Sequence, residues 1–426
     1  MEDQGIKVQL LSFMSLAHFT HHIELYLFPA MIILISEDIP ITYLEIGFLG
    51  TVPVLIMALT SPAIGLIASK HDYGFYTVLF GIFVFATANL VFGLANTPLD
   101  LFIGNLLLGI GCTTFHPVGL GVIANIFNSD YRGKALAINH ASGVIGTAVS
   151  PIMSISLTVF IFKEWHLMFL ILSFFCFLLV LFMLVWMFKQ GFMKYYINFQ
   201  RNESDKEYIL EKENRKNPHQ KVAFGWFITV IGIILIISSL RSGVYRSISY
   251  FTTTFMKDFY KVTSLQAGIL TSIILTSGSI TDVYGAVISD RSGTLARIKI
   301  VIISAIATIL SIVILILVTL EEANIFIILL GYIVFACSFY LAGGTLQALQ
   351  GEFISSKQRT FFYSIVFSLG LVISSISPTI IGGLLDFFNS PVEPLIFLSG
   401  LMGLSFIFAI ILFFQLKNGS RLAQSL

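Results

Sequence analysis

Long apolar segments recur along the whole chain and constrain its fold more than any other feature. The first, from Val8 to Ser36, is long enough to cross a hydrocarbon core of about 30 Å as a helix. Backbone groups inside a bilayer need hydrogen bonds within their own segment, so we expect helices and not the shorter, alternating strands of a membrane barrel. The sequence predicts twelve spans, at residues 8–36, 44–69, 75–95, 100–127, 135–161, 166–188, 222–256, 264–289, 297–319, 323–350, 359–385 and 392–416.

The composition agrees with a membrane protein. Hydrophobic residues form 56% of the chain and charged residues 11%, whereas a soluble domain carries roughly 25% charged residues. The formal net charge of +1 gives no reason to expect a nucleic-acid partner. Cys112, Cys176 and Cys337 lie in apolar segments, and three unpaired cysteines argue against a disulfide framework and a zinc site. The first seven residues lack the basic region and cleavage site of a signal peptide, so we expect an all-α integral membrane protein that keeps its first span.

One long polar stretch, residues 189–221, divides the predicted spans into two groups of six. It holds eight Lys or Arg and five Asp or Glu residues, and we interpret it as a solvated linker, with room for a short amphipathic helix at the membrane surface. The expected organisation is an N-terminal six-helix bundle over 1–188, this cytoplasmic linker, and a C-terminal six-helix bundle over 222–426. An internal repeat favours it: Arg132, Gly143, Ser150 and Pro151 recur 227 residues later as Arg359, Gly370, Ser377 and Pro378. Parallel repeats of this kind place a substrate site between the halves.

The distribution of basic residues predicts the orientation in the membrane. If both termini are cytoplasmic, nineteen Lys and Arg residues fall in cytoplasmic segments and three fall in outer loops. Without the linker the ratio is still eleven to three. Because positive residues concentrate on the cytoplasmic side of membrane proteins, we expect a multi-pass protein of the cell membrane with both termini inside.

The first span carries four ionisable residues near its middle: His18, His21, His22 and Glu24. A charge at the bilayer centre costs roughly 2.5–3.5 kcal/mol on insertion scales, so such residues usually serve the passage of a polar solute or a proton. At about 100° per residue the four cover an arc of roughly 160°. We expect His18, His21 and Glu24 to line a cavity and His22 to pack against another helix. The alternative for each histidine is a ring that is hydrogen-bonded between helices.

Two of the ionisable residues suggest roles in coupling and binding. Burial disfavours the charged form of a carboxylate, so Glu24 is the best candidate to carry a proton, with His21 as a second coupling group. Arg241 lies near the middle of the seventh span, and its planar fork suits a carboxylate, phosphate or phosphonate. We expect Glu24 and Arg241 to project into one central pocket. The alternative for Arg241 is a structural pairing with Glu24 or Asp282, and Arg246 is expected at the rim.

Further polar residues complete the candidate binding set. His116 precedes Pro117 in the fourth span, where proline removes a helical hydrogen bond and favours a polar bend. His140 lies before a glycine-rich stretch of the fifth span, and glycine, serine and proline there allow close helix approach. The expected substrate-binding residues are Arg241, His18, His21, His116, His140 and Tyr245.

The loop between spans eight and nine reads GAVISDRSG from Gly285 to Gly293. It resembles the signature of the major facilitator superfamily, a small residue followed by Asp-Arg-x-Gly. The resemblance implies two six-helix bundles and a charge-pair latch. The equivalent loop of the first half departs from the pattern, because Ser69 stands where an aspartate is expected. The gating residues expected on this basis are Asp290, Arg291, Gly293, Arg132 and Arg359.

A narrower resemblance begins in the fourth span, which reads GIGCTTFHP from Gly109 to Pro117. This run is similar to the G-x-G-x-x-x-F-H-P run of the fosmidomycin-resistance efflux proteins. The first span fits in part, since His18 matches while His22 stands in the place of an acidic residue. The resemblance implies a proton-coupled exporter of small, often anionic compounds, and it identifies no particular substrate.

These observations predict a secondary active transporter that moves a small polar or anionic organic solute by alternating access, through proton-coupled efflux. Two alternatives stay open: a proton-symport importer of an organic anion, and a His-rich divalent metal carrier, since His18 and His22 are spaced i, i+4. A channel or sensor fits less well, because the polar residues of the two halves differ. We find no Walker motif and expect neither ATP-driven transport nor an enzyme. The expected partners are the solute, protons and the lipid bilayer. We expect no metal or other cofactor, and we expect the carrier to work as a monomer.

Overall fold

The computed structural model describes residues 2–71, 73–127, 129–198, 224–290, 293–352 and 368–424, and the regular structure in these ranges is helical. Twelve helical segments are long and apolar enough to cross a membrane, which confirms the twelve expected spans and the all-α class. Some boundaries differ. The first segment runs from Gln4 to Asp38 and the seventh from Ile228 to Phe259. Residues 359–367 of the predicted eleventh span lie outside the described residues.

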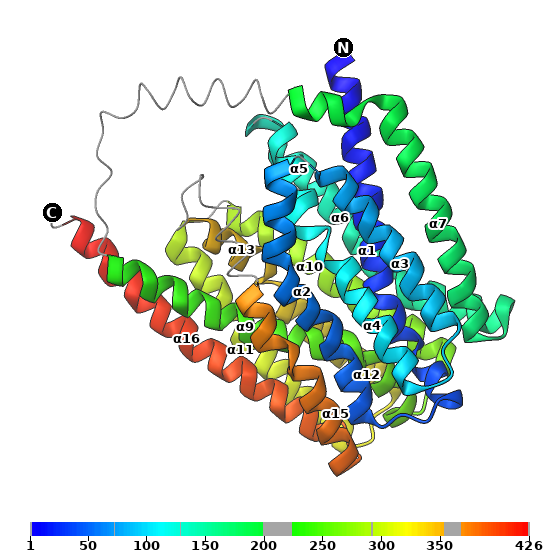
Figure 1. The fold of residues 1–426 in the computed structure, drawn as a ribbon. Helices are drawn as coiled ribbons and strands as arrows, with labels where there is room; N and C mark the ends of the chain where they lie inside the picture. The colour runs from blue at the N-terminus through cyan, green and yellow to red at the C-terminus, as the bar shows by residue number, and fades with distance from the viewer. Residues whose placement is uncertain are drawn as a thin grey trace.

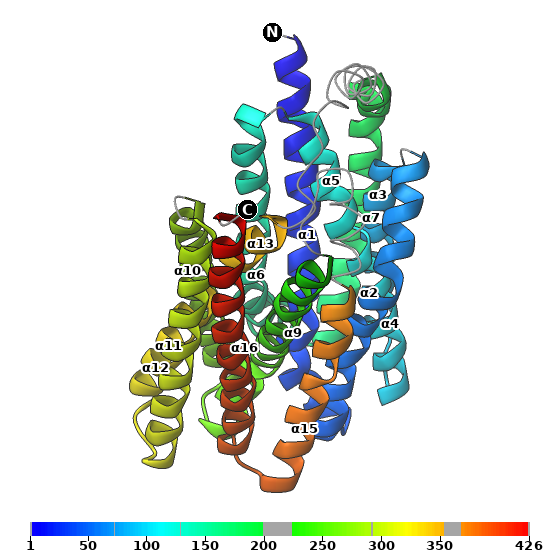
Figure 2. The same cartoon turned by 90° about the vertical axis from the view of Figure 1, so that its left-hand side faces the viewer.

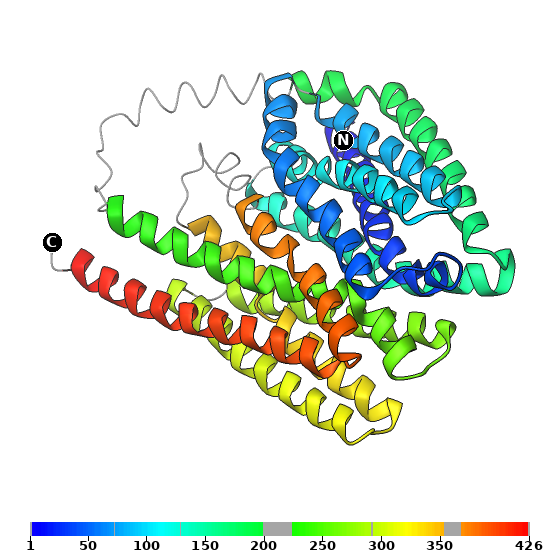
Figure 3. The same cartoon turned by 60° about the horizontal axis from the view of Figure 1, so that its bottom comes forward.

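The first seven helices gather on one side of the molecule (Figures 1 and 3). They are α1 Glu2–Asp38, α2 Tyr43–His71, α3 Gly74–Gly93, α4 Pro98–Thr113, α5 His116–Ile126, α6 Ser129–Leu157 and α7 Trp165–Gln190. A further helical segment covers residues 192–198, where Phe192 and Tyr196 are buried against Phe75. This segment falls in the stretch for which a short amphipathic helix was considered.

The remaining helices form the other side (Figures 1 and 3). They are α9 Phe224–Thr254, α10 Ser264–Asp290, α11 Thr294–Leu320, α12 Ile325–Tyr340, α13 Gly343–Glu352, α15 Ser377–Phe388 and α16 Val392–Gln424. Short π-helical turns, Thr158–Phe162 and Phe255–Phe259, extend α6 and α9. We call the two groups the first half, α1 to α7, and the second half, α9 to α16.

Three of the described spans are broken near their middle, and one of them, Ser368–Phe388, is interrupted at Ile376, directly before α15. The fourth is divided into α4 and α5 around Thr114 and Phe115, directly before the His116-Pro117 pair. Proline lacks an N–H and fits best in the first turn of a helix, which is the place that Pro117 takes in α5. The tenth span is divided at Leu341 and Ala342, before two glycines that open α13. Broken spans that face a bundle interior are common where transporters bind their cargo.

The two halves contact each other at the end of the bundle opposite the chain termini, which we call the distal end (Figures 1 and 2). Asp386 of α15 accepts hydrogen bonds from the backbone N–H groups of Tyr43, at 3.0 Å, and Leu44, at 2.8 Å. This carboxylate therefore caps the N-terminus of α2, where the helix dipole favours negative charge. Lys257 of the second half likewise pairs with Glu37 of α1.

Glycine allows α2 and α15 to touch along their backbones. A Cβ atom added at Gly47 would lie 2.2 Å from the carbonyl oxygen of Pro378, and one at Gly382 would lie 2.0 Å from that of Tyr43. The hydroxyl of Thr51 donates to the carbonyl oxygen of Ser375 at 2.6 Å within the same contact. The largest apolar cluster crosses this interface, whereas two smaller clusters belong to one half each.

Candidate functional site

Glu24 lies inside the first half. Its side chain is 2% exposed and accepts hydrogen bonds from the amide of Asn89 on α3, at 2.9 Å, and from the thiol of Cys176 on α7, at 3.2 Å. The expected cavity-lining position is therefore wrong, because the carboxyl group is enclosed by α1, α3 and α7. The surroundings provide two donors, so a buried carboxyl group is tolerated there.

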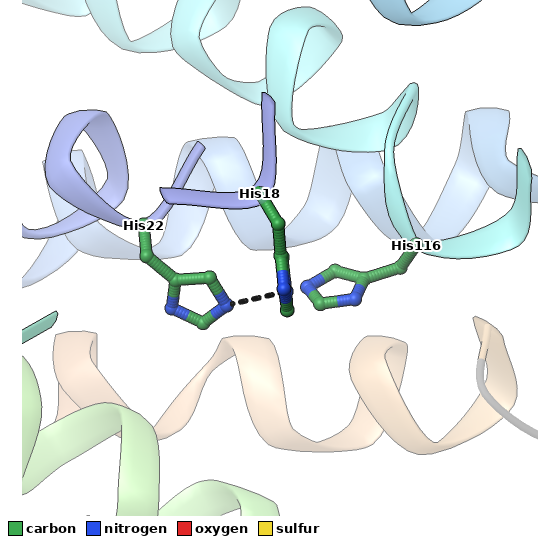
Figure 4. A group of neighbouring side chains, drawn as sticks. All are labelled: His18, His22 and His116. Atoms are coloured by element: carbon green, nitrogen blue, oxygen red, sulfur yellow. Dashed lines mark hydrogen bonds between the residues drawn. The ribbon is translucent and has the colours of Figure 1, made fainter. Parts of the chain in front are cut away.

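Three histidines bring their ring nitrogens together on another face of α1, and we call them the histidine cluster: His18, His22 and His116. One ligand-type nitrogen from each ring lies within 4.8 Å of the others. The Nε2 atoms of His18 and His22 are 3.1 Å apart, and the ring of His18 lies between the other two (Figure 4). His116 is presented by the break between α4 and α5.

The outer ring nitrogens of the pair on α1 are held by α6. His18 Nδ1 lies 2.7 Å from the carbonyl oxygen of Asn139, which can only accept, so this nitrogen carries the proton. His22 Nδ1 lies 2.8 Å from the hydroxyl of Thr147, which can donate or accept. Both rings are thus oriented with Nε2 toward the cluster. His22 contacts another helix as expected. It also belongs to the histidine cluster, although we expected it to lie apart from the other polar residues of the first span.

Close approach of α1 and α6 makes this arrangement possible. A Cβ atom added at Gly143 would lie 2.7 Å from Cε1 of His18 and 2.8 Å from Cδ2 of His22. One added at Gly146 would lie 2.6 Å from the backbone oxygen of Phe19. The glycine-rich stretch of the fifth span therefore allows the contact that was expected of it.

His21 is enclosed by aromatic rings. It is 1% exposed, and neither ring nitrogen has a hydrogen-bond partner among the described residues. Its ring centroid lies 4.8 Å from that of His116, 5.9 Å from Phe85 and 5.9 Å from Phe115. A buried polar group without a partner is costly, so His21 stays a candidate for a functional role.

Arg241 belongs to the interior of the second half. It is 4% exposed and donates to the carbonyl oxygen of Phe339 and, at 3.1 Å, to the hydroxyl of Ser304. Its guanidinium carbon lies 4.7 Å from the centroid of the Phe339 ring. It forms no ion pair with Glu24 or Asp282. The shared pocket expected for Glu24 and Arg241 is therefore wrong, since each is enclosed within its own half.

Arg246 lies at the interface of the halves and not at the rim where it was expected. It lines a cavity of about 30 Å³ together with Tyr26 and Pro53 of the first half and Tyr250 of the second. Neither Nε of Arg246 nor the hydroxyl of Tyr250 has a hydrogen-bond partner among the described residues. The sequence signal for this position is the spacing of Arg246, Ser249 and Tyr250 at i, i+3 and i+4, which places all three on one helical face.

Two pairs join the halves near this region. The hydroxyl of Tyr245, a predicted binding residue, contacts the hydroxyl of Tyr26 on α1. His140 of α6 lies 3.4 Å from the carboxylate of Asp282 on α10, and its side chain is 47% exposed. Asp282 also accepts from the backbone N–H of Gly344 at 2.8 Å. Tyr245 and His140 are thus contacts between the halves in this state.

The predicted gating residues lie largely beyond what the structure describes. Arg291 and Arg359 fall outside the described residues, as do the side chains of Asp290 and Arg132. Gly293 is described, is exposed, and directly precedes α11. The charge-pair latch stays a prediction.

Comparison with known proteins connects this geometry to a family. A family model described as Major Facilitator Superfamily matches residues 14–378. The chain is 27% identical over 131 residues to a probable 4-methylmuconolactone transporter of Cupriavidus pinatubonensis, which is 30% of each protein. It is 25% identical over 120 residues to a riboflavin transporter of Clostridioides difficile, covering 28% of this chain and 26% of that protein. These matches span less than a third of either relative.

The fold resembles a solved transporter along its whole length. A bacterial homolog of the human lysosomal transporter Spinster, in an inward-facing and occupied conformation, superposes with a TM-score of 0.66 at 14% identity, covering 97% of both chains. The inward-facing, unoccupied structure of such a homolog gives the same TM-score at 13% identity. The likeness concerns the fold.

Proposed function

Because the chain belongs to the Major Facilitator Superfamily, we propose that it moves a small polar or anionic organic solute across the cell membrane by alternating access, coupled to protons. It is a multi-pass membrane transporter, whose described residues include twelve helices long and apolar enough to span the membrane. Two relatives are named for small organic compounds, as a probable 4-methylmuconolactone transporter and a riboflavin transporter, which supports a solute of that size. The GIGCTTFHP run of span four supports a relation to the fosmidomycin-resistance exporters, and this relation favours efflux by proton antiport.

The observation that carries this proposal is that α1 connects a buried carboxyl group to the contact between the halves. Glu24 is held by Asn89 and Cys176 inside the first half. Tyr26, two residues further along α1, contacts Tyr245 of the second half. Loss of the Glu24 proton places a charge in an enclosed site that offers two hydrogen-bond donors and, among the described residues, no cation, which favours rearrangement of the helices around it. A shift of α1 reaches the other half through Tyr26, so Glu24 is suited to couple protonation to movement, with His21 on the same helix as the second coupling group.

The orientation in the membrane decides which side of the bilayer the closed distal end faces. With both termini in the cytoplasm, as the basic residues favour, the distal end faces outward. The contacts of Asp386, Thr51 and Lys257 then close the outer side. We propose that this is the inward-facing state, which exchanges solute and proton with the cytoplasm. Import by symport would use the same state, so the direction of the coupled proton flux has to be measured.

The test uses the full chain in proteoliposomes that contain a trapped pH-sensitive dye. Succinate or phenylphosphonate is added outside, and protein-free liposomes correct for passive entry of the acid. Antiport predicts that the lumen becomes more alkaline, whereas symport predicts that it becomes more acidic. We expect Glu24→Gln to abolish this proton flux while solute exchange without a pH gradient continues. The control is Glu321→Gln, which changes an exposed carboxylate in the loop after α11. Unchanged proton flux in Glu24→Gln would disprove the coupling role.

The histidine cluster favours a divalent metal carrier as the second candidate. Two nitrogens at 2.0–2.1 Å from a tetrahedral zinc ion are about 3.3–3.4 Å apart, and the Nε2 atoms of His18 and His22 lie at 3.1 Å. Hydrogen bonds at the other ring nitrogen are typical of metal-ligating histidines. Calorimetry with zinc and nickel separates the two functions: tight binding lost in His116→Ala supports the metal carrier, and absence of binding excludes it.

A further inference from the structure

We propose that Arg246 and Tyr250 of α9 form the subsite that binds the anionic group of the solute, a carboxylate or a phosphonate. This inference rests on the proposed transport function and assigns its substrate class to particular residues. It moves the anion-binding role from Arg241, which the sequence favoured, to a second arginine five residues further along the same helix.

The position of this subsite is that expected for a carrier. The cavity beside Arg246 is lined by Tyr26, Pro53 and Leu108 of the first half and by Arg246, Tyr250 and Pro378 of the second. Residues of both halves meet there, so the pocket changes whenever the halves move relative to each other. Its volume of about 30 Å³ is enough for a few water molecules at most and too small for an organic anion. The structure therefore represents a contracted pocket, in which the hydroxyls of Tyr26 and Tyr245 are in contact.

Three side chains that line this pocket, Arg246, Ser249 and Tyr250, each carry a buried polar atom without a partner among the described residues. Nε of Arg246 carries an N–H group and has no partner among the described residues. The hydroxyl of Tyr250 is also without a partner there, and this side chain is only 7% exposed. A guanidinium has five N–H donors and no acceptor, and a tyrosine hydroxyl can donate. Nε of Arg246 can only donate, so a ligand that satisfies it must offer an acceptor atom, and the hydroxyl of Tyr250 can donate to the same ligand.

The charge of the pocket points to the same ligand. Its lining residues include Arg246 and no carboxylate within the described part of the chain. The nearby acids are already engaged: Asp282 faces His140 and Gly344, and Glu24 faces Asn89 and Cys176. An arginine inside a membrane protein usually has a counter-charge, because an unpaired charge in a medium of low polarity is costly. The solute would supply that counter-charge.

Arg241 has the features of a structural residue by comparison. Nη2 of Arg241 donates to Ser304 and Phe339, and the guanidinium stacks on the Phe339 ring, all within the second half. Nη1 of Arg241 has no partner among the described residues either, but Arg241 does not line the cavity between the halves. Arg246 instead lies beside the ring of Tyr245, with its guanidinium carbon 5.4 Å from the centroid, at the interface. The planar fork of Arg246 suits the two oxygens of a carboxylate or phosphonate.

The experiment measures ligand binding to the purified full chain in nanodiscs by thermal stabilisation and calorimetry. The probes share one four-carbon frame: succinate, the neutral succinamide and the cationic 1,4-diaminobutane, with phenylphosphonate as the second oxyanion. We expect the two anions to bind and the neutral and cationic probes not to bind. Arg246→Gln should weaken anion binding about tenfold or more, and Tyr250→Phe about threefold to tenfold. Arg246→Lys should weaken the binding of phenylphosphonate less than that of succinate, since an ammonium is a point charge without the planar fork that matches a carboxylate.

Lys134→Gln is the matched control, because it removes an exposed cation from α6 and should leave binding unchanged. The proposal is overturned if neither anion binds at millimolar concentration, if succinamide binds as well as succinate, or if folded Arg246→Gln binds like the wild type. Anion binding that depends on Arg246 without any coupled proton flux would refute the transport function and leave the subsite. Coupled flux that persists unchanged in Arg246→Gln would refute the subsite and leave the function.

Discussion

At the scale of single residues, α1 carries a carboxyl group on one face and two histidines of the histidine cluster on another. Glu24 follows His22 by two residues, which is about 200° around a helix. The carboxyl group therefore faces α3 and α7, while His18 and His22 face α6. The sequence predicts which residues are polar and the arc that they cover. It does not predict their partners, because the neighbours Asn89, Cys176 and Thr147 come from helices that are distant in the chain.

The hydrogen bond from Asn89 to Glu24 provides a stability prediction. Asn89→Ala leaves a buried carboxylate oxygen without its amide donor, so we expect the free energy of unfolding to fall by about 1–3 kcal/mol. Denaturant titration in detergent micelles measures it. Asn96→Ala is the control, since Asn96 is exposed and bonds only to nearby backbone and Asp100. Equal effects of the two substitutions would show that the Asn89 hydrogen bond contributes nothing.

At the scale of helices, the spans follow from the sequence, whereas their interruptions follow only in part. Twelve apolar segments of sufficient length are readable because a bilayer permits little besides helix. The bend before Pro117 was foreseen from the proline, which cannot donate a helical hydrogen bond. The break at Leu341 and Ala342 and the π-helical turns after Leu157 and Thr254 were not foreseen. No proline marks these sites, and they depend on packing between the helices.

The close backbone contact between α2 and α15 predicts how a glycine substitution changes the closed distal end. Gly47→Ala would place a methyl group 2.2 Å from the oxygen of Pro378, whereas Gly383→Ala would place one at an ordinary 3.5 Å from the Leu44 side chain. Overpacking costs about 1–3 kcal/mol, so Gly47→Ala should lower the population of the closed distal end about fivefold or more. Gly383→Ala should leave it unchanged.

Distances between two spin labels, measured by double electron–electron resonance, test this prediction. Labels at Leu99 and Phe387 report on the distal end, where both side chains are exposed. Cys337, the half-buried member of the three free cysteines, is replaced by serine beforehand. If folded Gly47→Ala shows the distance distribution of the parent protein, the close contact of α2 and α15 does not govern this end.

At the scale of the whole molecule, the account concerns two halves that pack together at the distal end and are joined further along by the pairs Tyr26–Tyr245 and His140–Asp282. The sequence predicts two groups of six helices and the excess of basic residues on one side. It does not predict which end is closed, because one sequence must encode both states of a carrier. For the same reason it misplaces Arg246: the depth of a residue on α9 is readable, but its distance from α1 depends on how the halves are tilted. Arg241 and Glu24, chosen for their burial, lie within separate halves.

The most direct test of alternating access measures both ends of the protein under the same conditions. Labels at Leu99 and Phe387 follow the distal end, and labels at the exposed Tyr131 and Ala296 follow the end that carries the termini. As pH is varied across the range of transport, we predict that one distance lengthens while the other shortens, and that Glu24→Gln holds both in a single population. Distances that stay constant, or that lengthen together, would contradict the account.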